Sequence, residues 1–174
     1  MNKKLDNRNK LLYEFFIRPT YKFNIRELAR YTKLNPNTVL TLVNLFEKEG
    51  IVKKIVKKNK SEVYLNLDNK STIWKKRMFN LAQIYDSGIV DFLAEKYSPL
   101  SISVIGSYSR GEDIEKSDID IVIITNKKET MYLAKFEKLL HRRIHLIVAK
   151  RKDLSEEFFN NLINGIVLYG ALRA

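Results

Sequence analysis

The sequence has no cysteine, three prolines and six glycines among its 174 residues. The absence of cysteine excludes disulfides, iron–sulfur clusters, thiolate zinc sites and a cysteine nucleophile, and it fits a reducing compartment. Apolar residues make up 45% of the chain. The chain can therefore bury one large core or two small ones, and it is neither disordered nor fibrous.

Long hydrophobic runs are missing as well. The chain holds no run of about 18 apolar residues, the length that a membrane-spanning helix needs. Its first ten residues, MNKKLDNRNK, lack the apolar segment of a secretory signal. We therefore expect no membrane span and no export, and we expect the protein in the cytoplasm.

Acidic residues are scarce in the first part of the chain. The net charge is +12, and residues 1–75 hold 17 Lys and Arg against 7 Asp and Glu, whereas residues 76–174 hold 15 against 13. Clustered basic residues bind phosphate backbones because they release condensed counterions. The imbalance indicates two modules, of which the first binds a polyanion. A lysine-rich solubilising surface is the alternative.

Apolar residues recur at helical spacing near the N-terminus. They predict one helix over 5–17, which Pro19 stops, and a second helix over 25–31. Asn24 precedes the second helix and Glu27 follows three residues later, a variant of the capping box. We expect these two side chains to cap the first turn of that helix.

A third helix and a hairpin follow. Asn35 is placed to cap this helix, Pro36 suits its first position, and an apolar stripe continues up to Gly50. The period then becomes that of strands, over 51–56 and again over 62–67. The lysine-rich segment between the strands is the tip of a basic hairpin.

Three helices followed by a basic hairpin, over residues 5–68, resemble the winged helix-turn-helix domains of bacterial and archaeal regulators. The resemblance implies that the third helix enters the major groove of double-stranded DNA while the hairpin lies along the backbone. The polar face of that helix would be Asn35, Asn37, Thr38, Thr41 and Asn44. The hairpin lysines would be Lys53, Lys54, Lys57, Lys58 and Lys60.

This module has a second interpretation, because winged helices also serve in protein interaction or dimerisation. The hairpin lysines and the uncharged polar helix favour DNA. Since that helix carries no Arg to bridge a guanine edge, specificity would rest on amides, hydroxyls and DNA shape. A homodimer would fit paired half-sites, but no residue pattern requires one.

A helix without proline or glycine is predicted over 72–85. Ser87-Gly88 interrupts it, and apolar residues mark a further helix that ends before Pro99. We therefore expect a winged helix at 1–68, a linker helix at 69–86 and a second domain at 87–174. The linker helix carries the apolar residues Trp74, Met78 and Phe79. We expect them to pack either in a local core or against another domain or subunit.

The second domain has a short apolar strand that runs directly into a glycine turn. The strand covers 100–105, and Gly106-Ser107-Tyr108-Ser109-Arg110-Gly111 follows. At a helix N-terminus, a Gly-Ser pair lets backbone N–H groups and a hydroxyl approach a triphosphate closely. The 106–111 turn is therefore predicted to bind phosphate.

Two aspartates interrupt the next apolar strand. The strand period places Asp118 and Asp120 on one face, with Cα atoms about 6.6 Å apart. Like charges on a buried sheet face repel each other unless a cation compensates. The pair predicts a site for Mg²⁺ (or Mn²⁺) held together with the phosphates of a nucleotide.

The Gly-Ser turn, Arg110-Gly111 and the motif Ser117-Asp118-Ile119-Asp120 closely resemble the signature of the minimal nucleotidyltransferases, in the DNA polymerase beta-like superfamily. The resemblance covers about 87–170. It includes a helix near 129–140, a third strand at 143–148 and a closing segment at 164–170. It implies a small mixed sheet with flanking helices, so that the whole chain is α+β.

The same resemblance implies roles for individual residues. Gly106 and Ser107 would grip the triphosphate of ATP, and Asp118 and Asp120 would hold catalytic metals. Arg110 would either touch phosphate or brace the turn. Ser117 belongs to the same nucleotide-binding set.

The sequence departs from the family on the third strand. The family usually carries a third carboxylate there, which serves the metal that activates the acceptor hydroxyl. Here His145 occupies the position, and its neutral imidazole suits Mg²⁺ poorly. His145 is either a general base near neutral pH or a hydrogen-bonded strand histidine.

Two functions are compatible with these residues. The first is Mg²⁺-dependent transfer of AMP from ATP to a hydroxyl of a protein or small molecule; relatives of this size act beside partner proteins, including toxins with antitoxins. The second is a transcriptional regulator whose degenerate domain binds nucleotide or mediates assembly without catalysis. The Gly-Ser turn and the paired aspartates favour the first function, and His145 favours the second.

Overall fold

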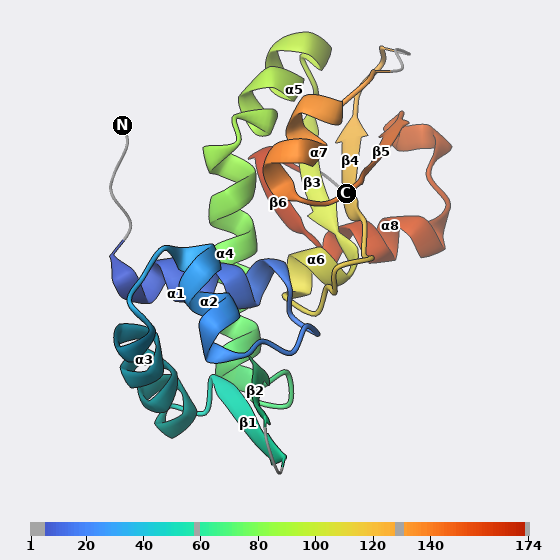
Figure 1. Ribbon diagram of the computed structural model, residues 1–174. Coiled ribbons are helices and arrows are strands. Elements are labelled where there is room, and N and C mark those ends of the chain that lie inside the picture. Colours follow the sequence, from blue (N-terminus) through green and yellow to red (C-terminus); the bar gives the residue numbers. More distant parts are fainter. Residues whose placement is uncertain (1–5, 58–59, 128–130, 173–174) are drawn as a thin grey trace. The chain divides into compact units, whose positions relative to one another are not determined.

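The computed structural model describes residues 6–57, 60–127 and 131–172, with the backbone but not the side chains of Lys57 and Lys60. The chain divides into two compact units. The first, or N-terminal unit, is Met1–Lys75, and the second, or C-terminal unit, is Lys76–Ala174. The division falls inside helix α4, Lys70–Asp86 (Figure 1). In the described ranges, no helix has both the length and the apolar character needed to cross a bilayer.

Helices followed by a hairpin make up the described part of the first unit (Figure 1). The elements are α1 (Asn7–Ile17), α2 (Ile25–Thr32), α3 (Pro36–Lys48), β1 (Val52–Lys57) and β2 (Lys60–Leu65). β1 and β2 are antiparallel, with Val52 opposite Leu65. Phe23 adds an antiparallel bridge to Val63 of β2. The predicted helices and hairpin are present.

The predicted caps of α2 and α3 are confirmed. Asn24 Oδ1 accepts the N–H of Glu27, and a Glu27 carboxylate oxygen accepts the N–H of Asn24, both at 2.9 Å. Asn35 Oδ1 accepts the N–H of Asn37 at 2.9 Å, and Pro36 is the first residue of α3. These bonds satisfy N–H groups that have no partner within the helix, which is why the helices begin there.

The core of the first unit lies where its helices meet β2. Phe15 and Phe23 are fully buried, and their rings meet edge to face with centroids 5.5 Å apart. Further buried side chains are Leu11, Leu28, Val39, Val43, Phe46, Val63 and Leu65. Because α3 buries one apolar stripe in this core, its polar side chains lie at the surface.

A mixed sheet with helices on both faces makes up the described part of the second unit (Figure 1). Its helices are residues 76–86 of α4, then α5 (Ile89–Tyr97), α6 (Gly106–Arg110), α7 (Ala134–Leu140) and α8 (Glu156–Ile163), with a 3₁₀ turn at Arg151–Asp153. Its strands are β3 (Ser101–Ile105), β4 (Ile119–Ile124), β5 (Ile144–Ala149) and β6 (Ile166–Gly170).

The strand order is β5-β4-β3-β6. β3 is antiparallel to β4 and to β6, whereas β4 and β5 are parallel. Leu93 of α5 and Phe136 of α7 pack with Ile121 on one face, and Leu162 of α8 packs with Val122 and Ile124 on the other. The predicted α+β class and mixed sheet are confirmed.

Some predicted boundaries are wrong. The helix expected over 129–140 begins at Ala134. Residues 131–133 are not helical, and residues 129–130 of the predicted range lie outside the described residues. The third strand runs one residue later than expected, and Asp118 lies directly before β4 rather than within it. Periodicity predicts that an element exists but defines its ends poorly, since terminal residues lack part of the hydrogen-bond ladder.

Candidate functional site

Strand register places the 106–111 turn beside Asp120. In the β3–β4 pair Ile105 lies opposite Asp120, and Gly106 then begins α6 with a φ of +74°. A Cβ added to Gly106 would lie 2.6 Å from Asp120 Oδ2, closer than side chains approach in proteins. Glycine is required here because the backbone is left-handed and the carboxylate occupies the space of a side chain.

The two aspartates are accessible to solvent. The Asp120 side chain is 32% exposed, and Asp118 is exposed. The same face of β4 continues into Val122 and Ile124, which are buried. The carboxylates therefore lie at the open end of this face, and the expectation that they are buried is wrong. The prediction of a metal site therefore rests on the oxygen donors of the two carboxylates and not on repulsion between buried charges.

His145 lies next to Asp120 on the neighbouring strand. Asp120 and His145 are paired residues of the parallel β4–β5 ladder, and Asp120 Oδ1 lies 3.0 Å from His145 Nδ1. The His145 side chain is 62% exposed. A hydrogen-bonded imidazole therefore lies beside Asp120, where the family resemblance leads one to expect a third carboxylate.

A polar cavity opens beside Asp118. It has a volume of about 410 Å³ and is lined by Glu115, Lys116, Ser117, Asp118 and Arg143, a size within the range of small-molecule sites. Ser117 Oγ also accepts the N–H of Ile114 at 3.0 Å. Ser117 thus lies beside the aspartates while it closes the turn that leads to them.

Arg110 is oriented by an acidic neighbour. Its Nε donates to a carboxylate oxygen of Glu112 at 2.7 Å, and both side chains are about half exposed. Both roles that the sequence left open for Arg110, contact with phosphate and bracing of the turn, stay predictions. Ser107 is half-buried in the first turn of α6, between Gly106 and the buried Tyr108.

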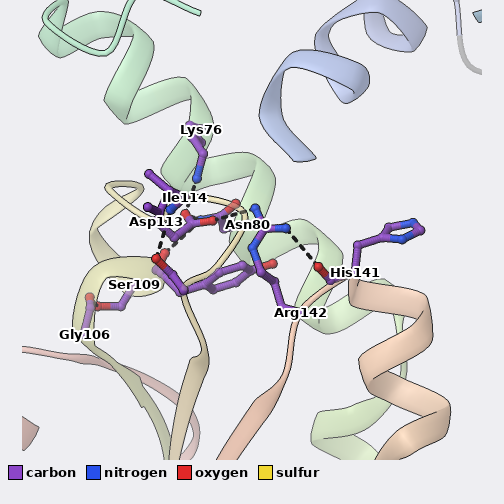
Figure 2. Close-up of polar contacts among 10 residues, drawn as sticks. Lys76, Asn80, Gly106, Ser109, Asp113, Ile114, His141 and Arg142 are labelled. Carbon is purple, nitrogen blue, oxygen red and sulfur yellow. Dashed lines mark hydrogen bonds and ion pairs between the residues drawn. The ribbon is translucent and has the colours of Figure 1, made fainter. Parts of the chain in front are cut away.

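Sequence reasoning missed a buried ionic cluster behind the turn, made of Asp113, Lys76, Asn80 and Arg142, here called the Asp113 cluster (Figure 2). Asp113 Oδ1 accepts from Lys76 Nζ and, at 2.7 Å, from Asn80 Nδ2. Asp113 Oδ2 accepts from Arg142 Nη2 at 3.2 Å. Burial lowers the pKa of the Lys76 ammonium, although the Asp113 carboxylate opposes this shift.

One sequence signal could have indicated this cluster. Lys76, Asn80 and Ile84 of α4 are spaced by four residues, and all of them are buried. Lys76 belongs to the run Lys75-Lys76-Arg77, which is typical of a solvated helix face. The helical period places Lys76 on the same face of α4 as the apolar Ile84. It does not identify the acidic residue that pairs with the Lys76 ammonium.

The segment with the strand, the glycine turn and the two aspartates is similar to a known protein family. Residues 87–168 match the family model described as a nucleotidyltransferase domain. The C-terminal unit contains a nucleotidyltransferase domain. Its α5, its strands β3, β4 and β5 and the aspartate pair lie within the matched residues, which end inside β6, whereas α4 lies before them.

Two relatives of the nucleotidyltransferase domain come from Methanocaldococcus jannaschii, and each is named "Putative protein adenylyltransferase". One is 38% identical over 65 residues, which cover 33% of this chain and 65% of the relative. The other is 58% identical over 31 residues, which cover 18% of this chain and 32% of the relative. The chain thus spans less than two thirds of each relative. No solved structure matches it.

Nucleotidyltransferases act on nucleoside triphosphates with a divalent metal, which requires donor atoms on the protein. Across residues 6–57, 60–127 and 131–172, no group of three or more His, Cys, Asp or Glu is arranged to hold a metal ion. Asp118 and Asp120 nevertheless offer hard oxygen donors. This donor set fits Mg²⁺, which binds through one or two carboxylates plus water and substrate phosphates.

The candidate DNA-binding residues of α3 lie largely at the surface. Asn35, Asn37, Thr41 and Asn44 are exposed, whereas Thr38 is half-buried. Some of their polar groups are occupied, because Thr41 Oγ1 donates to Asn37 O at 3.0 Å and Asn35 caps the helix. Asn44 Oδ1 accepts from Lys54 Nζ.

The hairpin lysines differ in their surroundings. Lys54 Nζ lies 2.6 Å from a carboxylate oxygen of Glu47, and its side chain is only 17% exposed. Lys53 forms an ion pair with Asp68. The side chains of Lys57 and Lys60 are not described, and Lys58 lies outside the described residues. Lys53 and Lys54 are thus partly neutralised by acidic partners.

Proposed function

We propose that the C-terminal unit transfers AMP from ATP to a hydroxyl of a partner protein. The packing of Gly106 against Asp120 carries this proposal, because it brings a glycine turn and a carboxylate pair to one point. The names of the two relatives support AMP as the transferred group and a protein as the acceptor.

The reaction exchanges one phosphorus–oxygen bond for another. The acceptor oxygen forms a bond to the α-phosphorus, the bond to the β-phosphate oxygen breaks, and pyrophosphate leaves. The backbone of the 106–111 turn and the hydroxyl of Ser107 bind phosphate oxygens, while Asp118 and Asp120 hold Mg²⁺ or Mn²⁺. When bound, the metal supplies positive charge that neutralises the phosphates.

His145 is the candidate base for the proton of the acceptor hydroxyl. It is exposed, and its Nδ1 is hydrogen-bonded to Asp120, so its orientation is fixed by the residue that also faces Gly106. A neutral imidazole within hydrogen-bond reach of a hydroxyl can accept its proton directly.

His145 also favours a second candidate function. His145 stands beside Asp120 where the family usually carries a third carboxylate. The site therefore offers a divalent metal less negative charge than the usual site of that family. In this alternative the C-terminal unit binds nucleotide without transferring it and so regulates the N-terminal unit. ATP binding without transfer would be its signature.

We also propose that the N-terminal unit is a winged helix that binds double-stranded DNA. The charge imbalance of the first 75 residues and the exposed amides of α3 support this proposal. An antitoxin-like protein that modifies its partner and represses its own promoter would combine both activities.

The transfer reaction is tested with ATP labelled at the α-phosphate and the proteins encoded beside this gene. We expect one of them to become labelled with Mg²⁺ or Mn²⁺ and to stay unlabelled with a chelator. Replacing both site aspartates, Asp118→Asn with Asp120→Asn, should abolish labelling because the metal loses its protein ligands.

The matched control changes two exposed aspartates elsewhere in the chain, Asp86→Asn with Asp91→Asn, which alters the net charge equally. This variant should label its acceptor at the wild-type rate. If wild-type protein binds ATP but labels none of the neighbouring or co-purified proteins, the enzymatic proposal is wrong and the nucleotide-binding alternative stands.

A further inference from the structure

We infer that Asp113 is a positioning residue, which fixes the 106–111 turn relative to Asp118 and to the strands that carry Asp120 and His145. The inference rests on the proposed function, because it concerns the nucleotide site of that reaction. Asp113 itself is fully buried, whereas Asp118 is exposed and Asp120 is half-buried. It acts through the side chains that hold its carboxylate (Figure 2).

The first link joins the cluster to the turn. Asn80 Nδ2 donates both to the backbone oxygen of Tyr108, at 2.9 Å, and to Asp113 Oδ1, at 2.7 Å. Tyr108 is the third residue of α6, two residues after Gly106. One amide group of α4 therefore fixes the distance between the turn and Asp113.

The second link joins the cluster to β5. Arg142 Nη2 donates to Asp113 Oδ2, and its Nη1 donates to the backbone oxygen of His141 at 2.9 Å. The next residue, Arg143, accepts the N–H of Ile119 at the start of β4. The ends of β4 and β5 from which Asp120 and His145 project are thereby held to the same carboxylate.

The third link is the loop from Asp113 to Asp118. Asp113 anchors its beginning, and the N–H of Ile114 donates to Ser117 Oγ one residue before Asp118. The loop is thus held at both ends. Asp113 connects, through side chains or through this loop, to each segment that the proposed reaction uses.

The buried charges of the Asp113 cluster favour a role in positioning the surrounding segments over a role in packing alone. Lys76 and Asp113 are fully buried, and the Arg142 side chain is 4% exposed. Desolvating such groups is unfavourable, and apolar side chains of similar volume often stabilise a core as well or better. Directional bonds from one carboxylate instead fix the relative placement of separate segments, which a nucleotide site requires.

The test removes the buried pair without changing the net charge of the cluster, by Lys76→Met with Asp113→Asn. We expect the affinity for ATP, measured by calorimetry well below the unfolding temperature, to fall roughly 10- to 100-fold, as for groups that orient functional ligands. The matched control, Glu14→Gln with Arg18→Met, removes an ion pair between α1 and the residue that follows it. It should leave ATP affinity unchanged.

A second variant separates an effect on ATP binding from a loss of folding. Asn80→Ala removes the bridging amide and no charge, and it should weaken ATP binding while the melting temperature stays within a few degrees. Unchanged ATP affinity in a folded variant overturns the inference, and so does an Asn80→Ala chain that fails to fold. If the wild-type chain binds no ATP, the proposed function itself is wrong.

Discussion

Gly106 is the residue of the 106–111 turn that lies against Asp120. Gly88 and Gly106 have nearly the same left-handed backbone, with φ of +75° and +74°. Nothing lies within 4 Å of a Cβ added to Gly88, whereas one added to Gly106 meets Asp120 Oδ2. The two positions therefore separate the effect of backbone strain from the effect of contact with the site.

Gly106→Ala and Gly88→Ala should both lower the free energy of unfolding by about 1 to 2 kcal/mol, because each places a Cβ on a left-handed residue. Only Gly106→Ala should also weaken ATP binding, since the new methyl group must displace the Asp120 carboxylate. Denaturant unfolding and calorimetry measure the two effects. Equal ATP affinity in the two variants would contradict the proposed contact between turn and aspartate.

At the scale of single elements, local signals were sufficient wherever the partners are close in sequence. The capping box of α2 joins Asn24 to Glu27 three residues away, and the cap of α3 joins Asn35 to Asn37. Both could be predicted because short-range hydrogen bonds depend on residue type and spacing. The helix near 134–140 has no capping side-chain bond at its start, and its beginning was predicted wrongly.

Removing the cap of α2 gives a prediction for this scale. Asn24→Ala should lower the free energy of unfolding of the full chain by about 1 kcal/mol, because the N–H of Glu27 loses its acceptor. Asn24→Asp keeps an acceptor oxygen and should remain close to wild type. Thermal unfolding followed by circular dichroism gives the comparison, and equal stability of the two variants would argue against the cap.

The candidate site was predictable only in part, for the same reason. The strand, the glycine turn and the aspartate pair follow one another within about twenty residues, so their pattern is visible in the sequence. The Asp113 cluster joins α4, the loop after α6 and the start of β5 across intervals of up to 37 residues. Such contacts exist only once the chain has folded, and spacing does not encode them.

At the scale of the whole molecule, the uneven charge leads to a prediction about salt. Retention of the chain on duplex DNA should fall steeply as salt rises. The slope of the logarithm of the binding constant against the logarithm of the salt concentration should become shallower by about 0.9 for each phosphate contact removed. We expect Lys57→Ala, Lys58→Ala and Lys60→Ala together to weaken binding. Lys53→Ala and Lys54→Ala should have smaller effects, because acidic side chains already pair with both lysines.

The control for this experiment removes three exposed lysines of the C-terminal unit, by Lys135→Ala, Lys138→Ala and Lys152→Ala. This variant loses the same charge but should keep nearly all of its affinity for DNA. If it loses as much affinity as the variant of the hairpin tip, the net charge of the chain causes the binding and the winged-helix proposal is wrong.

The Asp113 cluster also affects where the C-terminal domain begins. The residues that match the nucleotidyltransferase family start at 87, whereas Lys76 and Asn80 precede them. A truncated chain that begins at Ser87 would keep Asp113 and Arg142 but lose both partners from α4. The residues that match the family model are therefore fewer than those that complete the interior of the C-terminal unit, and the part of α4 from Lys76 onward belongs with that unit when the protein is divided.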